Sequence, residues 1–136
     1  MHPLLVKLNF KPGMPLIVAN APPSFQGILN QFSSEAELQL SIPAGKVRFI
    51  LVFAHSKDEV NSFSQRVLPK LEEDALVWFA YPKKSSKSLK TDISRDSGWE
   101  SLKKAQFETV RLVAIDNDWS ALRFRDSKYI KKSSGK

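Results

Sequence analysis

Polar side chains follow each of four apolar runs in the sequence, and together their types could do chemistry. Asn20 follows the first run, His55 the second, Lys83 and Lys84 the third, and Asp116 the fourth. An amide, an imidazole, two ammonium groups and a carboxylate could hold a polar ligand, and the imidazole could also move a proton. The first question is therefore whether the fold brings these positions together.

The basic residues after the third run have two readings. Lys83 and Lys84, with Arg95 further along, could hold a phosphate or carboxylate through charge-assisted hydrogen bonds. A solvated loop explains them equally well. His55 could serve as a general base or as a hydrogen-bond donor to a phosphate. It could also be a surface residue beside a helix cap.

The remaining candidates are equally open. Asp92 could act as an acid or base. Asp116 and Asp118 could bind a metal through hard oxygen ligands, although Asp-Asn-Asp is also ordinary turn chemistry. Trp119 could form a pocket wall or belong to the core, and Arg123 lies on a short basic stripe. The candidate ligand-binding set comprises Asn20, His55, Tyr81, Lys83, Lys84, Asp92, Arg95, Trp119 and Arg123, with no catalytic residue, metal ligand or cofactor assigned.

The elements that would position these residues alternate along the chain. Apolar runs predict buried strands at 15–20, 47–54, 75–81 and 110–115. Helical apolar spacing follows Ser24 and Ser56, the latter in a capping box with Glu59, and a second capping box predicts a short helix after Ser97. Pro69 should interrupt the second helix near its end.

This alternation predicts an α/β three-layer sandwich with a mostly parallel, minimal Rossmann-like sheet. Residues 119–125 should return as a C-terminal antiparallel strand after the turn at 116–118. If the four buried strands are parallel, their polar followers share one rim. The alternating segment 36–42 is a further strand. Because only Pro43-Ala44-Gly45 links it to the next strand, it is either shorter than its pattern suggests or antiparallel.

Composition limits the class of protein. The 136 residues fit one domain, predicted as 1–126, with a basic and disordered tail at 127–136. There is no cysteine, no membrane-length apolar run and no secretory signal pattern, so we predict a bacterial cytoplasmic protein. The net charge of +7 is uneven. Residues 1–81 hold seven charges of each sign, so the excess lies in 82–104 and 119–136.

Three segments carry a resemblance to a known family. These are Trp78-Phe79-Ala80-Tyr81-Pro82-Lys83-Lys84, Thr91 to Asp96, and Ile115 to Arg125. They resemble the bacterial domain-of-unknown-function family number 3052, whose members also have an early apolar strand followed by an Asn-Ala-Pro-like turn, as at 16–22 here. The resemblance covers roughly residues 15–125. It implies a small α/β domain of the bacterial cytoplasm and carries over no established activity.

Familiar catalytic and nucleotide-binding motifs are absent. The chain has no Gly-x-Gly-x-x-Gly, no phosphate-binding loop, no His-Glu-x-x-His and no Gly-x-Ser-x-Gly. Residues 20–25 resemble the Asn-Pro-Pro-aromatic motif of adenine methyltransferases. The inserted Ala21 breaks its spacing, and no cofactor-binding strand with a glycine loop fits into the nineteen preceding residues. On these grounds the match is discounted.

Three functions are compatible with these patterns. The first, which the patterns favour, is a module that binds a small anionic or phosphorylated ligand at the rim. The second is a protein- or nucleic-acid-interaction domain that uses the basic C-terminal end. The third is an enzyme of unknown class, with His55 or Asp92 as acid or base. The sequence carries no membrane-binding signal and says nothing about oligomeric state.

Overall fold

The computed structural model describes residues 1–86 and 89–130. In chain order its elements are α1 (Pro3–Lys7), β1 (Leu16–Ala19), η1 (Pro23–Phe25), α2 (Gln26–Ser33), β2 (Leu38–Gln39), β3 (Val47–Phe53), α3 (Lys57–Val67), η2 (Leu68–Lys70), β4 (Leu71–Pro82), α4 (Glu100–Lys104), β5 (Phe107–Ala114), β6 (Trp119–Asp126) and η3 (Ser127–Tyr129). Among these, no helix is both long and apolar enough to cross a membrane.

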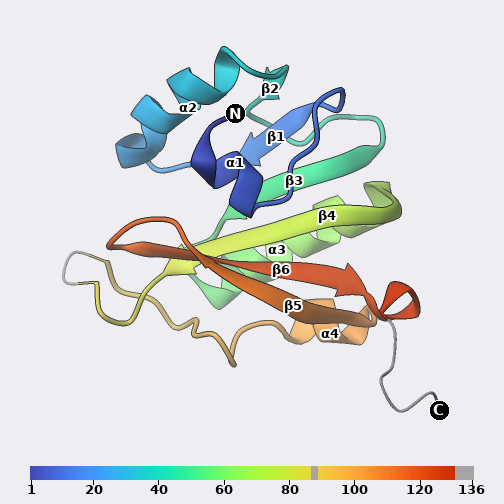
Figure 1. Cartoon of the computed structure of the whole chain (residues 1–136). Coiled ribbons are helices and arrows are strands. Elements are labelled where there is room, and N and C mark those ends of the chain that lie inside the picture. The colour runs from blue at the N-terminus through green and yellow to red at the C-terminus, as the bar shows by residue number, and fades with distance from the viewer. Residues whose placement is uncertain (87–88, 131–136) are drawn as a thin grey trace.

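The strands form one mixed sheet in the order β2-β1-β3-β4-β6-β5 (Figure 1). Strands β1 to β4 run parallel, and β6 runs antiparallel to both of its neighbours, β4 and β5. Helices α1 and α2 pack on one face, and α3 and α4 pack on the other. The predicted three-layer α/β class, with its mostly parallel sheet and antiparallel C-terminal strand, is confirmed.

Each face of the sheet has its own apolar core. On the α1 and α2 side, Phe53 and Trp78 lie fully buried against residues of both helices. On the other side, Phe79 packs against Trp99 and Phe124. Burying a large apolar side chain contributes roughly 1.5–3 kcal/mol, so these central strands dominate the stability of the fold.

The strand predicted at 36–42 is short and parallel. Only Leu38 and Gln39 pair with β1, in register with Leu16 and Ile17. Because β2 is so short, residues 40–46 suffice to lead the chain to β3 on the far side of β1. Of the two alternatives that the sequence left open, the shorter strand is correct.

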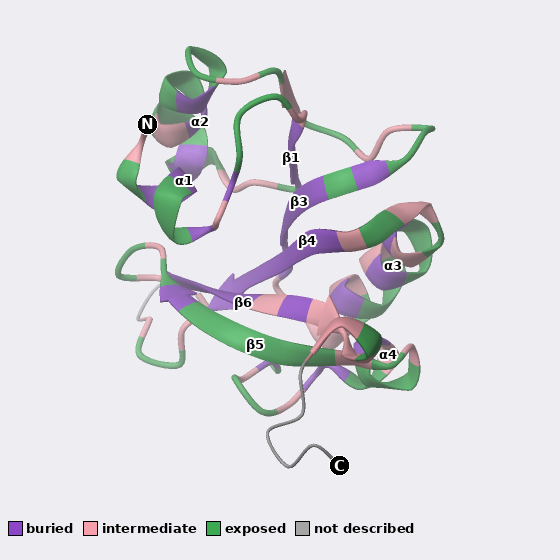
Figure 2. Ribbon diagram, turned by 45° about the vertical axis from the view of Figure 1, so that its right-hand side comes forward, coloured by how far each residue is buried: buried purple, intermediate pink, exposed green. Residues whose placement is uncertain are grey.

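The strand predicted as buried at 110–115 is instead exposed. β5 lies at the sheet edge, and Figure 2 shows it exposed along most of its length. Val110 and Leu112 are 40% and 45% exposed, whereas Val113 is buried. An edge strand has a neighbour on one side only, so its apolar pattern alone does not guarantee burial.

Helix starts were predicted with mixed success. Ser56 caps α3 by accepting a hydrogen bond from the Glu59 amide at 3.2 Å, and α3 ends at Val67 before Pro69, as predicted. Ser24 does not cap a helix, because Pro23 opens the 3-10 turn η1 and α2 begins only at Gln26. The predicted capping box at Ser97 is also wrong, since Trp99 is the N-cap of α4 and makes no side-chain cap bond.

The N-terminal segment was not predicted to have structure. In the fold, α1 buries Leu4 and Leu5, and Leu8 and Phe10 join the same core. The carbonyl of Leu8 accepts a 2.9 Å hydrogen bond from the buried Trp78 indole. At the other end, η3 covers part of the predicted tail, and residues 131–136 of that prediction lie outside the described residues.

Candidate functional site

The polar residues that follow β1, β3, β4 and β5 lie at the same end of the sheet, where these strands have their carboxyl ends. This end is here called the rim. β5 shares the direction of β4 because β6 is antiparallel to both. The geometric premise drawn from the sequence is therefore confirmed. The chain diverges between β1 and β3, since β2 lies beyond β1 while β4 lies beyond β3. In open α/β sheets, ligands bind at this switch point.

Asn20 stands at the switch point, directly after β1. Its backbone adopts a left-handed conformation with φ of 63°, which asparagine tolerates better than most residues. Its side-chain amide donates a 2.8 Å hydrogen bond to the carbonyl of Phe53, the last residue of β3. The bond ties the two strand ends together. Among residues 1–86 and 89–130, none donates a hydrogen bond to the Asn20 Oδ1, which could accept one from a ligand.

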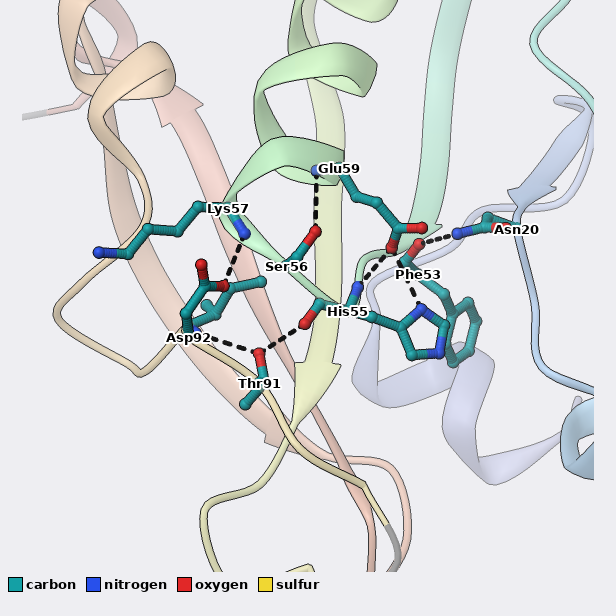
Figure 3. A network of polar contacts seen from close by, with 9 residues as sticks. Asn20, Phe53, His55, Ser56, Lys57, Glu59, Thr91 and Asp92 are labelled. Carbon is teal, nitrogen blue, oxygen red and sulfur yellow. Dashed lines mark hydrogen bonds and ion pairs between the residues drawn. The ribbon is translucent and has the colours of Figure 1, made fainter.

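His55 and Glu59 form a pair on the other side of this point. One oxygen, Glu59 Oε1, accepts from the His55 backbone amide at 2.6 Å and lies 3.1 Å from His55 Nδ1. Both side chains are 40% exposed. A capping box would have sent the carboxylate to Ser56, so its turn toward His55 is a departure from the predicted pattern. Figure 3 shows the pair beside Asn20 at the ends of β1 and β3.

The segment from Thr91 to Ile93 clamps this region from the β4 side. Thr91 Oγ1 donates to the His55 carbonyl at 2.7 Å and accepts from the Ile93 amide at 3.0 Å. Asp92 accepts from the Lys57 amide at 2.8 Å, at the start of α3 (Figure 3). Because a carboxylate at a helix N-terminus is stabilising, we assign Asp92 to holding this loop in place.

Trp119 lies beneath the imidazole. Its ring is 5.0 Å from that of His55 and 5.0 Å from that of Phe53, in edge-to-face geometry, and it is 2% exposed. Of the two alternatives for Trp119, the core aromatic is correct. Its ring also supports His55 from below, which limits where the imidazole can point.

A separate open cavity of about 480 Å³ lies over the end of β4. Four of the predicted site residues line it: Tyr81, Lys83, Lys84 and Arg95. Ser85, Ser94 and Asp96 also belong to its lining. Burial raises the pKa of the Tyr81 phenol above its ordinary value, and Asp96 adds to the rise while Arg95 opposes it. The rim thus holds two groups of predicted residues, one at the switch point and one over β4.

Arg123 belongs to neither group. It sits in the middle of β6, where it pairs with Trp78 and Arg111 across the sheet. Its Nε is buried without a hydrogen bond, and burial lowers the pKa of its guanidinium, with a further lowering from Arg125. Trp119 is the residue of β6 that pairs with Pro82 at the rim, so Arg123 lies away from the rim in the middle of the strand.

The described residues offer no ready set of metal ligands. Among the described residues, no group of three or more His, Asp or Glu side chains lies close enough to hold an ion. Asp116 instead accepts from the amides of Asp118 and Trp119, each at 2.8 Å, which is the turn chemistry considered as the alternative.

Glu59 is the site residue that sequence reasoning missed. It was assigned to a helix cap, and its spacing of four from His55 was not used. His55 precedes the extended N-cap Ser56 of α3, so the helical rule for residues four apart does not cover this pair, and the contact depends on how the chain enters the helix.

Comparison with known proteins gives the fold a clear class. No protein-family profile and no curated protein sequence matches the chain. Solved structures do match. A SAM dependent methyltransferase from Aquifex aeolicus aligns over 90% of this chain and 87% of its own, with a TM-score of 0.63 and 12% identity.

Two further solved structures that match the fold are also methyltransferases. The N-methyltransferase NodS from Bradyrhizobium japonicum has a TM-score of 0.56 at 9% identity, covering 90% of this chain and 92% of its own. Magnesium protoporphyrin IX methyltransferase from Synechocystis, with bound SAH, has a TM-score of 0.60 at 9% identity, covering 91% and 78%. By contrast, the chain spans only 38% of LepI, which was solved in complex with SAM. At such identities the likeness shows the fold alone, a Rossmann-like α/β fold that these methyltransferases also have.

This class corrects the functional prediction made from the sequence. A stand-alone anion-binding module was expected from the basic loop, with an interaction domain as the alternative. The consistent methyltransferase neighbours overturn that prediction. The prediction relied on local charge. A cluster of basic residues favours an anionic ligand nearby, but it does not indicate the fold on which those residues lie.

S-adenosylmethionine (SAM), the ligand named with LepI, carries a sulfonium, an ammonium and a carboxylate but no phosphate. Asn20 makes the tight left-handed turn for which nucleotide-binding folds use glycine. Pro22 and Pro23 lack the N–H groups of a phosphate cradle, but this ligand has no phosphate to hold. The exposed carboxylate of Glu59 and the Oδ1 of Asn20 are acceptors suited to its cationic groups.

The adenosine end of SAM would find fewer complementary side chains in this chain. In dinucleotide-binding sheets of this kind, an acidic residue some twenty positions after the turn holds the ribose hydroxyls. Here β2 is followed by Leu40, Ser41 and Ile42, none of which is acidic. Losing one charge-assisted hydrogen bond costs about 1.5–3 kcal/mol, so the fit predicts weaker binding than a site with that acid.

Proposed function

We propose that this chain is a methyltransferase that binds SAM at the rim over β1 and β3. The observation that carries the proposal is the position of the Glu59–His55 pair and Asn20 at the switch point of a methyltransferase fold. When bound, SAM supplies an electrophilic methyl group on a sulfonium sulfur. The chain's own part is to bind, orient and deprotonate.

The division of the rim supports two subsites. Asn20 Oδ1 and the second carboxylate oxygen of Glu59 would hold the cationic end of SAM over the switch point. The cavity over β4, lined by Tyr81 and Ser94 among others, lies further along the same rim and would receive the body of the acceptor, whose reacting group would extend toward His55 at the switch point. Its size of about 480 Å³ is within the range of small-molecule sites. The acceptor is therefore a small molecule.

Two predictions from the sequence remain part of the proposal. The first is membership of the bacterial domain-of-unknown-function family number 3052, on the three segments quoted above. The second is a cytoplasmic location, where SAM is available to an enzyme.

Direct binding tests the proposal. We expect S-adenosylhomocysteine (SAH), the product form of the donor, to bind the full chain with one-to-one stoichiometry in isothermal titration calorimetry. Ala21→Trp would place a large side chain on the rim beside Asn20 and should abolish the binding heat. Glu73→Trp, at the opposite end of β4, is the matched control and should leave it unchanged. If neither SAM nor SAH binds the wild-type chain at millimolar concentration, the proposal is wrong.

A further inference from the structure

Backbone and side-chain contacts fix the position of His55 although its side chain is partly exposed. Its backbone amide and its Nδ1 both meet Glu59 Oε1, and its carbonyl accepts from Thr91. Its ring rests with edge-to-face geometry on Trp119, at 5.0 Å between ring centres. Among the described residues, none hydrogen-bonds to the remaining ring nitrogen, Nε2. The imidazole is therefore oriented, with one nitrogen left to act on a ligand.

The contact with Glu59 determines which nitrogen carries the hydrogen. An ionised carboxylate can only accept, so Nδ1 of the neutral ring must donate to it. The lone pair then resides on Nε2. The same carboxylate would stabilise the imidazolium that forms when Nε2 takes a proton, as in other carboxylate–imidazole pairs. This arrangement has the chemistry of a general base.

We infer that His55 is the general base of the methyl transfer and that Glu59 is its positioning residue. This inference rests on the proposed function, which it deepens by naming the substrate class. The acceptor is a protic nucleophile, an N–H or O–H group, that must lose its proton. As the acceptor's lone pair bonds to the methyl carbon, the carbon–sulfur bond breaks and its electron pair stays on sulfur. The acceptor's proton passes to His55 Nε2.

The other histidine provides a control within the chain. His2 Nδ1 accepts a hydrogen bond from the Leu4 amide at 3.0 Å, so the hydrogen of its neutral ring resides on Nε2. The two histidines therefore have opposite tautomers. His2 lies at the start of α1, on the N-terminal segment rather than at the ends of β1 and β3.

Two measurements on the full chain test the inference. Long-range proton–nitrogen NMR should show Nδ1–H for His55 and Nε2–H for His2. Diethyl pyrocarbonate, which modifies unprotonated imidazole nitrogens, should modify His55 by mass spectrometry, and saturating SAH should slow that modification at least severalfold while leaving His2 unaffected. Glu59→Gln, which removes the charge but keeps the shape, should slow modification of His55 alone.

The outcomes separate this inference from the proposed function. If SAH binds but leaves His55 as reactive as before, or if His55 has the Nε2–H tautomer, the base assignment is wrong while the methyltransferase proposal stands. If SAH does not bind at all, both are wrong. In an assay for SAH release with amine and hydroxyl acceptors, His55→Asn should lose about 10²–10⁴-fold in rate with SAH binding retained, and His2→Asn should keep full activity.

Discussion

The side-chain amide of Asn20 donates a 2.8 Å hydrogen bond to the carbonyl of Phe53, and this bond joins the carboxyl ends of β1 and β3. It crosses the point where the sheet's chain direction diverges. The floor of the proposed site is therefore set by two residues that are 33 positions apart in the sequence.

The contribution of this bond can be isolated with a matched variant. Asn20→Ala removes the bond and also places alanine in a left-handed conformation. Asn9→Ala has the same backbone penalty, since φ of Asn9 is 62°, but breaks no side-chain hydrogen bond to the part of the chain that the structure describes. We expect Asn20→Ala to lower the free energy of unfolding by about 1 kcal/mol more than Asn9→Ala in urea denaturation. Equal losses would mean that the Asn20 bond does not stabilise the fold.

The ion pair between Asp74 and Arg125 predicts acid sensitivity. Two hydrogen bonds of 2.7 Å from the Arg125 guanidinium lower the pKa of Asp74 from its ordinary 3.8. Because the folded-state pKa is depressed, the stabilisation is present above the unfolded value and is lost as pH falls below about 4 through the folded pKa.

The test compares wild type with Asp74→Asn, since asparagine also tolerates the left-handed backbone at this position. At pH 7 the variant should be less stable by about 0.2–1 kcal/mol, a small value because both side chains are about a third exposed. As pH falls through the folded-state pKa of Asp74, the two proteins should converge in urea midpoint. A difference independent of pH would contradict the ionic origin.

The anchoring of the N-terminal segment depends on Trp78. Trp78→Phe removes the indole that donates to the Leu8 carbonyl and leaves space in a fully buried site. We expect a loss of about 2–4 kcal/mol in the free energy of unfolding, from the smaller ring and the unpaired carbonyl together. Faster amide exchange throughout α1 should accompany it. Unchanged exchange in α1 would show that Leu8 is held by other contacts.

The exposure of β5 predicts tolerance at a position that the sequence pattern marked as buried. Leu112→Lys should change the free energy of unfolding by less than about 0.5 kcal/mol, as expected for an exposed site. Val113→Lys, one residue along and 5% exposed, should be strongly destabilising because it buries an unpaired charge. Thermal unfolding of both variants decides this, and comparable losses would contradict the edge position of β5.

Features set by neighbouring residues were predictable from the sequence. The cap of α3 at Ser56 and the end of that helix before Pro69 depend on local backbone chemistry, and both are observed. The sharing of one rim by several strand ends follows from parallel topology alone.

Features set by the sheet order were not predictable. Whether the strand at Val110 is buried depends on whether a further strand lies beyond it, which no local pattern records. Arg123 was grouped with the rim because its charge matched, although its place in the middle of β6 separates it from the strand ends. The Asn20–Phe53 bond needs the register of two strands, and that register comes from the whole core.

Backbone amide NMR of the full chain, titrated with SAH, tests the central claim most directly. We expect saturable shifts at Ala21, His55 and Glu59, which surround the switch point between β1 and β3. Residues at the opposite end of the sheet, such as Leu71 and Tyr129, should stay unchanged. Shifts confined to that opposite end, or no shifts at millimolar SAH, would contradict the assignment of this rim as a methyl-donor site.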